Sequence, residues 1–396
     1  MAELKKINIG IIGAYHHPNF GDQLLFNILS EWIWDRYPEA KINVPWGDSE
    51  EIEWPNGVVV GGGLKVLLSC DAIIFGGGGY FGEPGEKAQR KKNAYTTLDK
   101  VGCFFRLPEG FGGKYFGEYG YLRAETFRFV KLGLIASVLK LARIPYAIIG
   151  AGLGPITTGL GKIGVRQSLK YAQRITLRDV ESVNYANELF QSDTILVSND
   201  MVLSVMRQVT DWELKARARV AVHLGPATDR SISIVELERL VSSIQKMGAE
   251  VSLISDCRPQ SGCEVLQDKL IKNLGSNVNY IPYQGVDNFI RLISEFDLIV
   301  TSKLHCGILA YREGVVPISI AEHIKTRRFY KQAGLEANSF DLSTSGFRNA
   351  LERIGAVLQN PSQEFQMLRE KREEIHQSAN FNRIVLKKFL CECLGE

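Results

Sequence analysis

The stretch FDLIVTSKLHCGILAYREGVVPISIA, from Phe296 to Ala321, decides the fold. Its first part, Asp297–Thr301, is short, apolar and largely β-branched, which predicts a buried strand. Ser302 is a typical helix N-cap, and we expect the helix after it to end at Gly314, before a second strand at Val316–Ile320. A strand, a helix and a strand in this order predict one unit of a parallel sheet.

The helix in this unit begins with residues that favour an anion. Lys303, Leu304 and His305 occupy its first turn, at the carboxyl end of a strand. Unpaired backbone N–H groups and the positive end of the helix dipole point there into the crevice where open α/β sheets bind ligands. A cation and an imidazole at this place predict a receptor for an anion that undergoes acid–base chemistry. For an isolated Lys-x-His, a solvated lysine and a histidine used only for capping remain the alternative.

Two further strand ends carry residues of interest. The strand Ile7–Gly13 runs into a segment with Asn19 and Asp22, and the strand Asp71–Phe75 runs into glycines 76–79. Glycines directly after a strand let the backbone approach a ligand closely and adopt positive φ. Asp22 could act as a base, hold a substrate hydroxyl or only cap its helix. Neither segment fits G-x-G-x-x-G or the P-loop, so no motif predicts a nucleotide.

Strands alternate with helical periods along the chain, which predicts two doubly wound Rossmann-like domains that face each other across a cleft, as in GT-B glycosyltransferases. We expect the first over residues 1–209, with an insertion at 82–120 that is rich in glycine and aromatic residues. The second follows a polar linker, Gln208–Arg217, and covers 218–362. A charged helical tail, 363–396, could cross back to brace the first domain. The insertion fits either a lid that stacks on sugar rings or an aromatic cluster that staples the loop.

Composition excludes several classes of protein. The chain of 396 residues is 45% hydrophobic and 23% charged, and its net charge of +3 is too small to predict a nucleic-acid partner. Seven cysteines without CxxC spacing predict reduced thiols in a cytoplasmic protein and no metal site. The chain enters a strand soon after Met1, so we expect no signal peptide, and no apolar stretch is long enough to cross a membrane.

One apolar helix face leaves peripheral membrane contact open, because it could either pack on a sheet or lie on a membrane. This face consists of Phe129, Leu132, Ile135, Ala136 and Leu139. The oligomeric state cannot be predicted from these patterns.

Taken together, these segments resemble the polysaccharide pyruvyl transferase family. The matching motifs follow the family's order and are Asn19-x-Gly-Asp22, Asp71–Gly78, Gly150–Pro155, Thr176–Ser182, Asn199-Asp200, Ser302–His305 with Gly314–Pro317, and a lysine at Lys325. The resemblance implies transfer of pyruvate from phosphoenolpyruvate to two hydroxyls of a sugar as a cyclic ketal. It implies phosphoenolpyruvate as co-substrate, a sugar or polysaccharide acceptor, and no cofactor.

Together with their positions at strand ends, the resemblance implies roles for individual residues. We expect donor binding by Arg178, Lys303, Leu304 and Lys325, acceptor binding by Asn19, Gly77 and Gly78, and catalysis by His305 and Asp22. Arg178 and Lys303 belong to different domains and should face each other across the cleft. Without the resemblance, Arg178 would instead be read as a local salt bridge with Asp179. Similar proteins usually carry arginine in place of Lys303, and lysine lacks the bidentate fork of arginine.

Two other functions are compatible with such a cleft. A glycosyltransferase with a nucleotide-sugar donor would need a carboxylate for the ribose, but Glu313 lies at the wrong end of its helix. A pseudoenzyme that only binds glycans or anions is disfavoured because His305, Arg178 and the Asn19-x-Gly-Asp22 motif are intact. The sequence predicts neither the sugar and its hydroxyl pair nor whether the acceptor is free, nucleotide-linked, lipid-linked or polymeric.

Overall fold

The structure is a computed structural model that describes residues 7–15, 19–47, 52, 54–81, 119–207, 217–225, 228, 232–257, 264–274, 278–321 and 323–395. Most of the predicted insertion at 82–120 lies outside these residues, and so does nearly all of the predicted linker. The interpretations of both segments therefore stay predictions.

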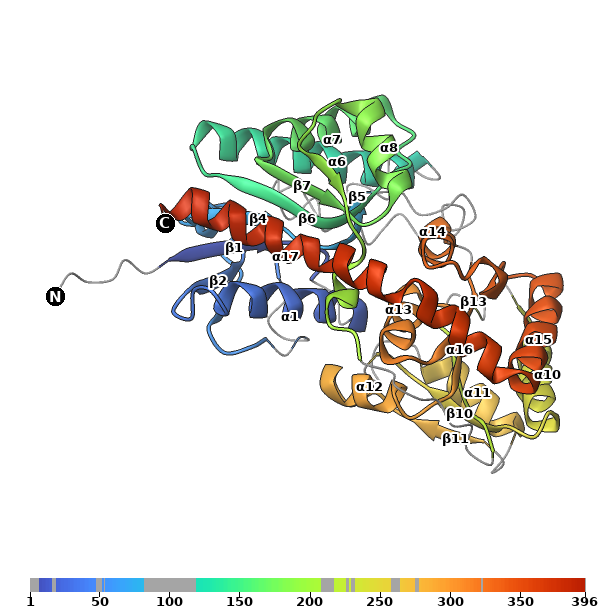
Figure 1. The fold of residues 1–396 in the computed structure, drawn as a ribbon. Coiled ribbons are helices and arrows are strands. Elements are labelled where there is room, and N and C mark those ends of the chain that lie inside the picture. Colours follow the sequence, from blue (N-terminus) through green and yellow to red (C-terminus); the bar gives the residue numbers. More distant parts are fainter. Residues whose placement is uncertain are drawn as a thin grey trace.

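Two parallel β-sheets form the centre of the chain (Figure 1). The strands of the first sheet are β1 (Asn8–Ile12), β2 (Lys41–Val44), β3 (Val58–Val60), β4 (Ala72–Phe75), β5 (Gly78–Phe81), β6 (Tyr146–Leu153), β7 (Arg174–Leu177) and β8 (Ile195–Val197). Those of the second are β9 (Arg219–His223), β10 (Glu250–Ile254), β11 (Asn279–Ile281), β12 (Leu298–Thr301), β13 (Val316–Ile320) and β14 (Ser339–Phe340).

The strand order of both sheets is that of a doubly wound fold. In the first sheet it is β3-β2-β1-β4-β6-β7-β8, with β5 paired to β6 outside this path, and in the second it is β11-β10-β9-β12-β13-β14. Each order counts down to the first strand and then up again, as in Rossmann folds. The predicted fold class, α/β with two Rossmann-like domains in a GT-B-like arrangement, is therefore confirmed.

Helices connect successive strands. Those of the first domain are α1 (Phe20–Trp34), α2 (Gly63–Leu67), α6 (Tyr119–Leu141), α7 (Gly159–Tyr171), α8 (Val180–Leu189) and the 3-10 helix η1 (Met201–Ser204). Those of the second are α10 (Ile234–Lys246), α11 (Glu264–Leu274), α12 (Val286–Ile293), α13 (Leu304–Glu313), α14 (Ile324–Gln332), the 3-10 helix η4 (Glu336–Asn338) and α15 (Thr344–Gln359). The chain then forms α16 (Pro361–Glu370) and the long α17 (Arg372–Leu394).

Helices cover both faces of the first sheet, which explains its continuous apolar strands. Tyr146 and Ile148 pack in a cluster with α6 and α7, whereas Ala147 and Ile149 pack in the cluster that contains α1 and α17. Because neither face meets water, β6 is buried along its whole length instead of alternating between apolar and polar residues.

The strand order also places the candidate site. The strand order reverses between β1 and β4 in the first domain and between β9 and β12 in the second. Doubly wound folds bind ligands outside the carboxyl ends of the strands at such a reversal. The segments that follow these strands include the glycines after β4 and the Lys303–His305 turn after β12. The motifs singled out from the sequence therefore lie at both reversal points.

The terminal helix α17 runs across both domains (Figure 1). Its buried Asn382 accepts hydrogen bonds from Thr176 Oγ1 at 2.6 Å and Ser198 Oγ at 2.9 Å, and donates one to the Asn199 carbonyl at 2.8 Å. These partners follow or belong to strands that end at the candidate site. Asn382 thus fixes the tail to the first domain next to the site.

We expect Asn382→Ala to lower the free energy of unfolding by about 2–3 kcal/mol, because it leaves buried hydroxyl groups without their acceptor. Denaturant unfolding measures this change. Arg383→Ala is the matched control, since Arg383 is half exposed and, among the described residues, forms an ion pair only with the exposed Asp35. This control should change stability by less than about 0.5 kcal/mol. Equal effects of the two substitutions would contradict the anchoring role of Asn382.

The apolar face of α6 packs on the first sheet, with exposed fractions between 0% for Phe129 and 7% for Leu132, which confirms packing and excludes the membrane alternative for this face. The prediction of reduced thiols is wrong. Cys257 is disulfide-bonded, so the cysteines are not all reduced, although Cys306 is free. Among the described residues, no helix is both long and apolar enough to cross a bilayer.

Candidate active site

The turn from β12 into α13 differs from the prediction in its cap. Lys303, with φ −116° and ψ 136°, is the N-cap of α13, so the assignment of Ser302 to this position is wrong. Ser302 Oγ instead accepts from the Gly225 amide at 2.7 Å and thereby fixes the loop after β9. The amides of Leu304 and His305 have no acceptor among the described residues, as expected for a helix start. The helix ends at Gly314 with φ 81°, as predicted.

At the start of α1, the capping residue is Asn19. Its Oδ1 accepts from the Gly21 amide at 3.2 Å, and its Nδ2 donates to Asp22 Oδ2 at 3.0 Å. The interpretation of Asp22 as the helix cap is therefore wrong, because Asp22 is the third residue of α1, within its first turn. Asn19 orients the Asp22 carboxylate and leaves its second oxygen for another partner.

The two helix starts meet at Gly21 and His305. A Cβ atom built on Gly21 would lie 1.9 Å from His305 Nδ1 and 2.7 Å from His305 Cβ. The imidazole of the second domain therefore packs directly on the backbone of the first. This contact explains why the Asn19-x-Gly-Asp22 motif needs a glycine at its third position.

We expect Gly21→Ala to displace His305 and to lower the catalytic rate at least tenfold, while the first domain stays folded. The cause is steric, since the added methyl group has no room against the imidazole. Gly159→Ala is the control, because a Cβ there meets nothing within 4 Å. Rate measurements and thermal unfolding of both variants test this. A Gly21→Ala protein as active as the wild type would show that the contact is not needed.

Arg178, which follows β7, forms a buried ion pair that the sequence did not predict. Its NH1 lies 3.3 Å from Asp200 Oδ2, and the two side chains are 6% and 3% exposed. The neighbouring Asp179 does not pair with it, since Asp179 caps α8 by accepting from the Ser182 amide at 2.7 Å. The local salt bridge considered for Arg178 and Asp179 is therefore wrong.

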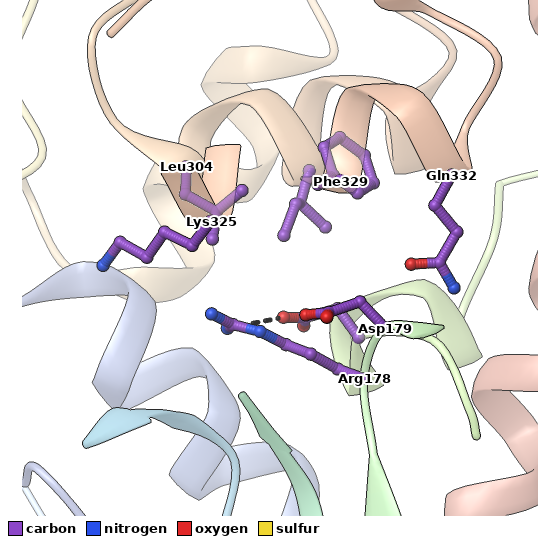
Figure 2. Close-up of a pocket in the computed structure, with 8 residues that line it drawn as sticks. Arg178, Asp179, Leu304, Lys325, Phe329 and Gln332 are labelled. Carbon is purple, nitrogen blue, oxygen red and sulfur yellow. Dashed lines mark hydrogen bonds and ion pairs between the residues drawn. The ribbon is translucent and has the colours of Figure 1, made fainter. Parts of the chain in front are cut away.

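Residues of both domains line one pocket (Figure 2). They are Arg178, Asp179, Asp200, Leu304, Ile308, Lys325, Phe329 and Gln332. Arg178 approaches from the first domain, and Lys325 approaches from the start of α14 in the second. The pocket holds about 230 Å³ of space that protein atoms do not fill, part of it open to solvent. Lys325 has no ion-pair partner among the described residues.

Lys303 takes a different position from Arg178 and Lys325. Its Nζ donates to Asp256 Oδ1 at 2.5 Å, and it is not among the residues that line the pocket. The same carboxylate lies 3.2 Å from His223 Nε2. Burial alone would raise the pKa of Asp256, but Lys303 and His223 outweigh it and hold this pKa well below its usual range. Lys303 thus joins a buried charge network beside the pocket, within electrostatic reach of Asp22.

The charge network also contains a possible ligand set for a cation. His223, Asp256 and Cys306 bring ligand atoms within 4.8 Å of one another. The Lys303 ammonium already stands next to the Asp256 carboxylate, where a metal ion would have to bind. We therefore assign this cluster to positioning Lys303.

The glycines after β4 serve packing as well as access. A Cβ on Gly77 would lie 2.5 Å from the Met201 side chain, so Gly77 is needed for close packing of the first domain. Gly78 opens β5 with φ 120°, a conformation that favours glycine. A Cβ on Gly79 would lie 3.7 Å from Arg178 NH2 and 3.9 Å from Lys325 Nζ. Gly79 therefore lies close to both cations.

The environment shifts the pKa values of three groups in the cleft. Burial raises the pKa of Asp22 to about 6, although Lys325, Arg178 and the Asn19 hydrogen bond oppose this. Burial, with help from Arg178 and Lys325, lowers the pKa of His305 to about 4 against the pull of Asp200, 3.8 Å from its Nε2. Loss of hydration between the walls of the cleft, together with repulsion from Arg178, lowers the pKa of Lys325. Part of the Lys325 side chain is nevertheless exposed. At neutral pH, His305 is uncharged and Asp22 is mostly a carboxylate.

Two acidic residues contribute to the site although the sequence analysis did not select them as site residues. Asp200 lies between Arg178 and His305, and Asp256 holds Lys303. Both follow strands of parallel sheets, β8 and β10. Since the carboxyl ends of such strands share one edge, the rule that selected Lys303 could have selected these acids as well.

The comparisons with known proteins agree with this geometry. Residues 19–323 match the family described as polysaccharide pyruvyl transferase. The chain belongs to this family. The matched range includes Asn19, Arg178 and His305, and it ends two residues before Lys325. No curated protein is similar enough in sequence to count as a match.

Solved structures resemble this family member in fold alone. The chain is similar to S. aureus MnaA in complex with UDP, with a TM-score of 0.58 and 9% identity over 99% of this chain and 98% of that one. It is also similar to a putative UDP-N-acetylglucosamine 2-epimerase from Listeria monocytogenes, with a TM-score of 0.56 and 10% identity over 98% and 97%. A third is Anabaena HepE with UDP and glucose, with a TM-score of 0.55 and 11% identity over 97% and 99%.

Proposed function

We propose that this pyruvyl transferase family member transfers pyruvate from phosphoenolpyruvate to two hydroxyls of a sugar in a polysaccharide or its precursor. The observation that carries the proposal is the convergence of Arg178, Lys325 and the free amides of α13 on one interdomain pocket beside His305. A donor with a carboxylate and a phosphate bears close to three negative charges. Cations and helix N-termini stabilise such an anion.

At C2 of the donor, the reaction forms two C–O bonds and breaks two bonds, the π bond to C3 and the C–O bond to the phosphate. One sugar hydroxyl adds to C2 while C3 takes a proton, and the second hydroxyl then replaces the phosphate at C2. The product is a cyclic ketal and inorganic phosphate. The hydroxyls lose two protons, of which C3 gains one and the departing phosphate accounts for the other. This balance needs no oxidant, metal or cofactor besides phosphoenolpyruvate as co-substrate.

The titrating groups suit these two proton transfers. Asp22, with a pKa of about 6, can accept a proton from a sugar hydroxyl near neutral pH. His305 is neutral in the free protein, and a bound phosphate would raise its pKa and let it deliver a proton. Asn19 holds the Asp22 carboxylate, and Gly79 leaves room for the acceptor beside Arg178.

The direct test is incubation of the protein with phosphoenolpyruvate and a panel of sugars, with no nucleotide sugar present. We expect phosphate release that depends on one class of sugar, and a product that carries one pyruvate ketal per transfer. A parallel assay contains a nucleotide sugar and no phosphoenolpyruvate. Turnover in this second assay alone would support the glycosyltransferase alternative. Tight donor binding without turnover on any sugar panel would support a pseudoenzyme.

Lys303 provides a test of the donor receptor. We expect Lys303→Ala to weaken phosphoenolpyruvate binding roughly ten- to a hundredfold, because one charge-assisted contact contributes about 1.5–3 kcal/mol. Its loss also removes the ion pair of the buried Asp256 carboxylate, which keeps its contact with His223. Lys303→Arg should retain or improve affinity. Calorimetry of both variants measures this, with the exposed Lys331→Ala as control. Wild-type affinity of Lys303→Ala would exclude this helix start from the donor site.

A further inference from the structure

One segment of the first domain has an unusual charge distribution. Residues 126–178 contain nine basic residues and no aspartate or glutamate. Since the whole chain has a net charge of only +3, the remainder of the chain is net negative. Two of the nine, Arg174 and Arg178, pair with acids elsewhere in the chain, so seven remain on or next to α6 and α7. Most of this segment forms α6, β6 and α7.

Two of these basic residues and several apolar ones are exposed on the face of α6 and α7 that points away from the sheet, here called the outer face. Leu160 and Ile163 of α7 are 62% and 63% exposed, and Leu134 of α6 is 53% exposed. Lys162 and Arg166, also exposed, lie between and beside them. Neither Lys162 nor Arg166 forms an ion pair with any described residue. Exposed aliphatic groups interspersed with unpaired cations are the pattern of helices that lie on a membrane surface.

The two helices form one continuous face. Thr126 Oγ1 in the first half of α6 donates to Oγ1 of Thr158, the N-cap of α7, at 2.8 Å, and a Cβ on Gly164 would lie 2.2 Å from the Phe129 carbonyl oxygen. These contacts place α6 and α7 side by side on one face of the first sheet (Figure 1). The helix α17 packs on the other face of this sheet. The inward stripe of α6 packs on the sheet, so the outer stripe has no partner within the described chain.

We propose that this outer face of α6 and α7 binds the surface of an anionic lipid bilayer. Its cations match the charge of anionic headgroups, and Leu160, Ile163 and Leu134 can insert between them. A second copy of the chain is a poorer occupant, because a symmetric contact would bring two acid-free basic faces together. A nucleic acid would use the cations but not the aliphatic groups. The start of α7 and Arg178 both lie at the carboxyl edge of the sheet. A protein bound to a membrane through the outer face would therefore hold the pocket near that membrane.

Vesicle flotation with the full-length protein tests the proposal. We expect binding to vesicles in which about one third of the lipid is phosphatidylglycerol and the rest is phosphatidylcholine. Binding to pure phosphatidylcholine should be slight, and high salt should weaken binding to the mixed vesicles. The double variant Lys162→Glu/Arg166→Glu should bind at least roughly 25-fold more weakly, because each basic residue near an anionic surface contributes about fivefold. Ile163→Ser should weaken binding roughly tenfold through lost apolar burial.

Matched controls lie on α17, on the other face of the same sheet. Lys387→Glu/Lys388→Glu makes the same charge change at exposed positions, and Ile384→Ser removes an aliphatic group that is 62% exposed. Both should bind vesicles like the wild type. Equal losses in the α7 and α17 variants, or no binding of the wild type, would overturn the proposal. It would also be overturned if Ile163→Ser changed the oligomeric state but not vesicle binding, because the face would then contact a second copy.

Discussion

His305→Gln is expected to lower the catalytic rate by about 10²–10⁴-fold while the protein stays folded and binds much of its donor. Glutamine keeps a hydrogen-bonding side chain of similar reach but cannot be protonated near neutral pH. It therefore separates proton transfer from contact with the substrate. His305→Ala should be at least as slow and should bind the donor less well. Steady-state rates and donor titration of both variants measure this.

A structural readout accompanies this test. The pKa of His305 is about 4 in the fold and 6.5 in the unfolded chain. Between pH 6.5 and 4, the unfolded chain therefore binds a proton at His305 that the folded chain does not bind. Stability should therefore decrease as the pH falls from 6.5 towards 4, and His305→Gln should remove this part of the decrease. A glutamine variant that turns over within a few-fold of the wild type would leave His305 as a ligand only. Proton transfer would then pass to Asp22 or to the phosphate of the donor.

Much of the fold could be predicted because its signals are local. Apolar runs bounded by glycine or polar residues predicted β13 with its observed bounds and β12 to within one residue, and the glycine after α13 predicted its end. Short edge strands such as β3 and β14 were not predicted, since they carry too few residues for a period. The start of α13 was predicted within a residue, but its cap was not, because Ser302 bonds to the Gly225 loop instead.

The site could be predicted only in part, for a related reason. Position at a strand end selects residues such as Arg178 and Lys303, but not their partners, because ion pairs join segments far apart in the chain. Arg178 pairs with Asp200, and Lys303 pairs with Asp256. The collision that forbids a side chain at Gly21 depends on how the two domains meet. No local pattern contains that information.

Asp22→Asn should lower kcat/KM by about 10²–10⁴-fold and at the same time stabilise the fold at pH 7. The rate falls because asparagine cannot accept a proton from the sugar. The pKa of Asp22 is about 6 in the fold and 3.8 in the unfolded chain. As the pH rises from 3.8 to 6, the unfolded chain ionises this carboxyl more readily than the folded chain does, so the wild type loses stability that Asp22→Asn keeps. Asparagine has no charge to bury and can still accept from Asn19.

The pH profile distinguishes Asp22 from the donor. In the wild type, kcat/KM should fall as the pH drops below about 6, because Asp22 then holds a proton. Phosphate groups also titrate near 6, so the donor alone would give a similar decrease. Asp22→Asn should retain only the decrease due to the donor, at a much lower rate. An asparagine variant that keeps both the wild-type rate and the full decrease would assign the titration to phosphoenolpyruvate. Asp22 would then only hold the acceptor, and the base would have to be sought among the carboxylates beside Arg178.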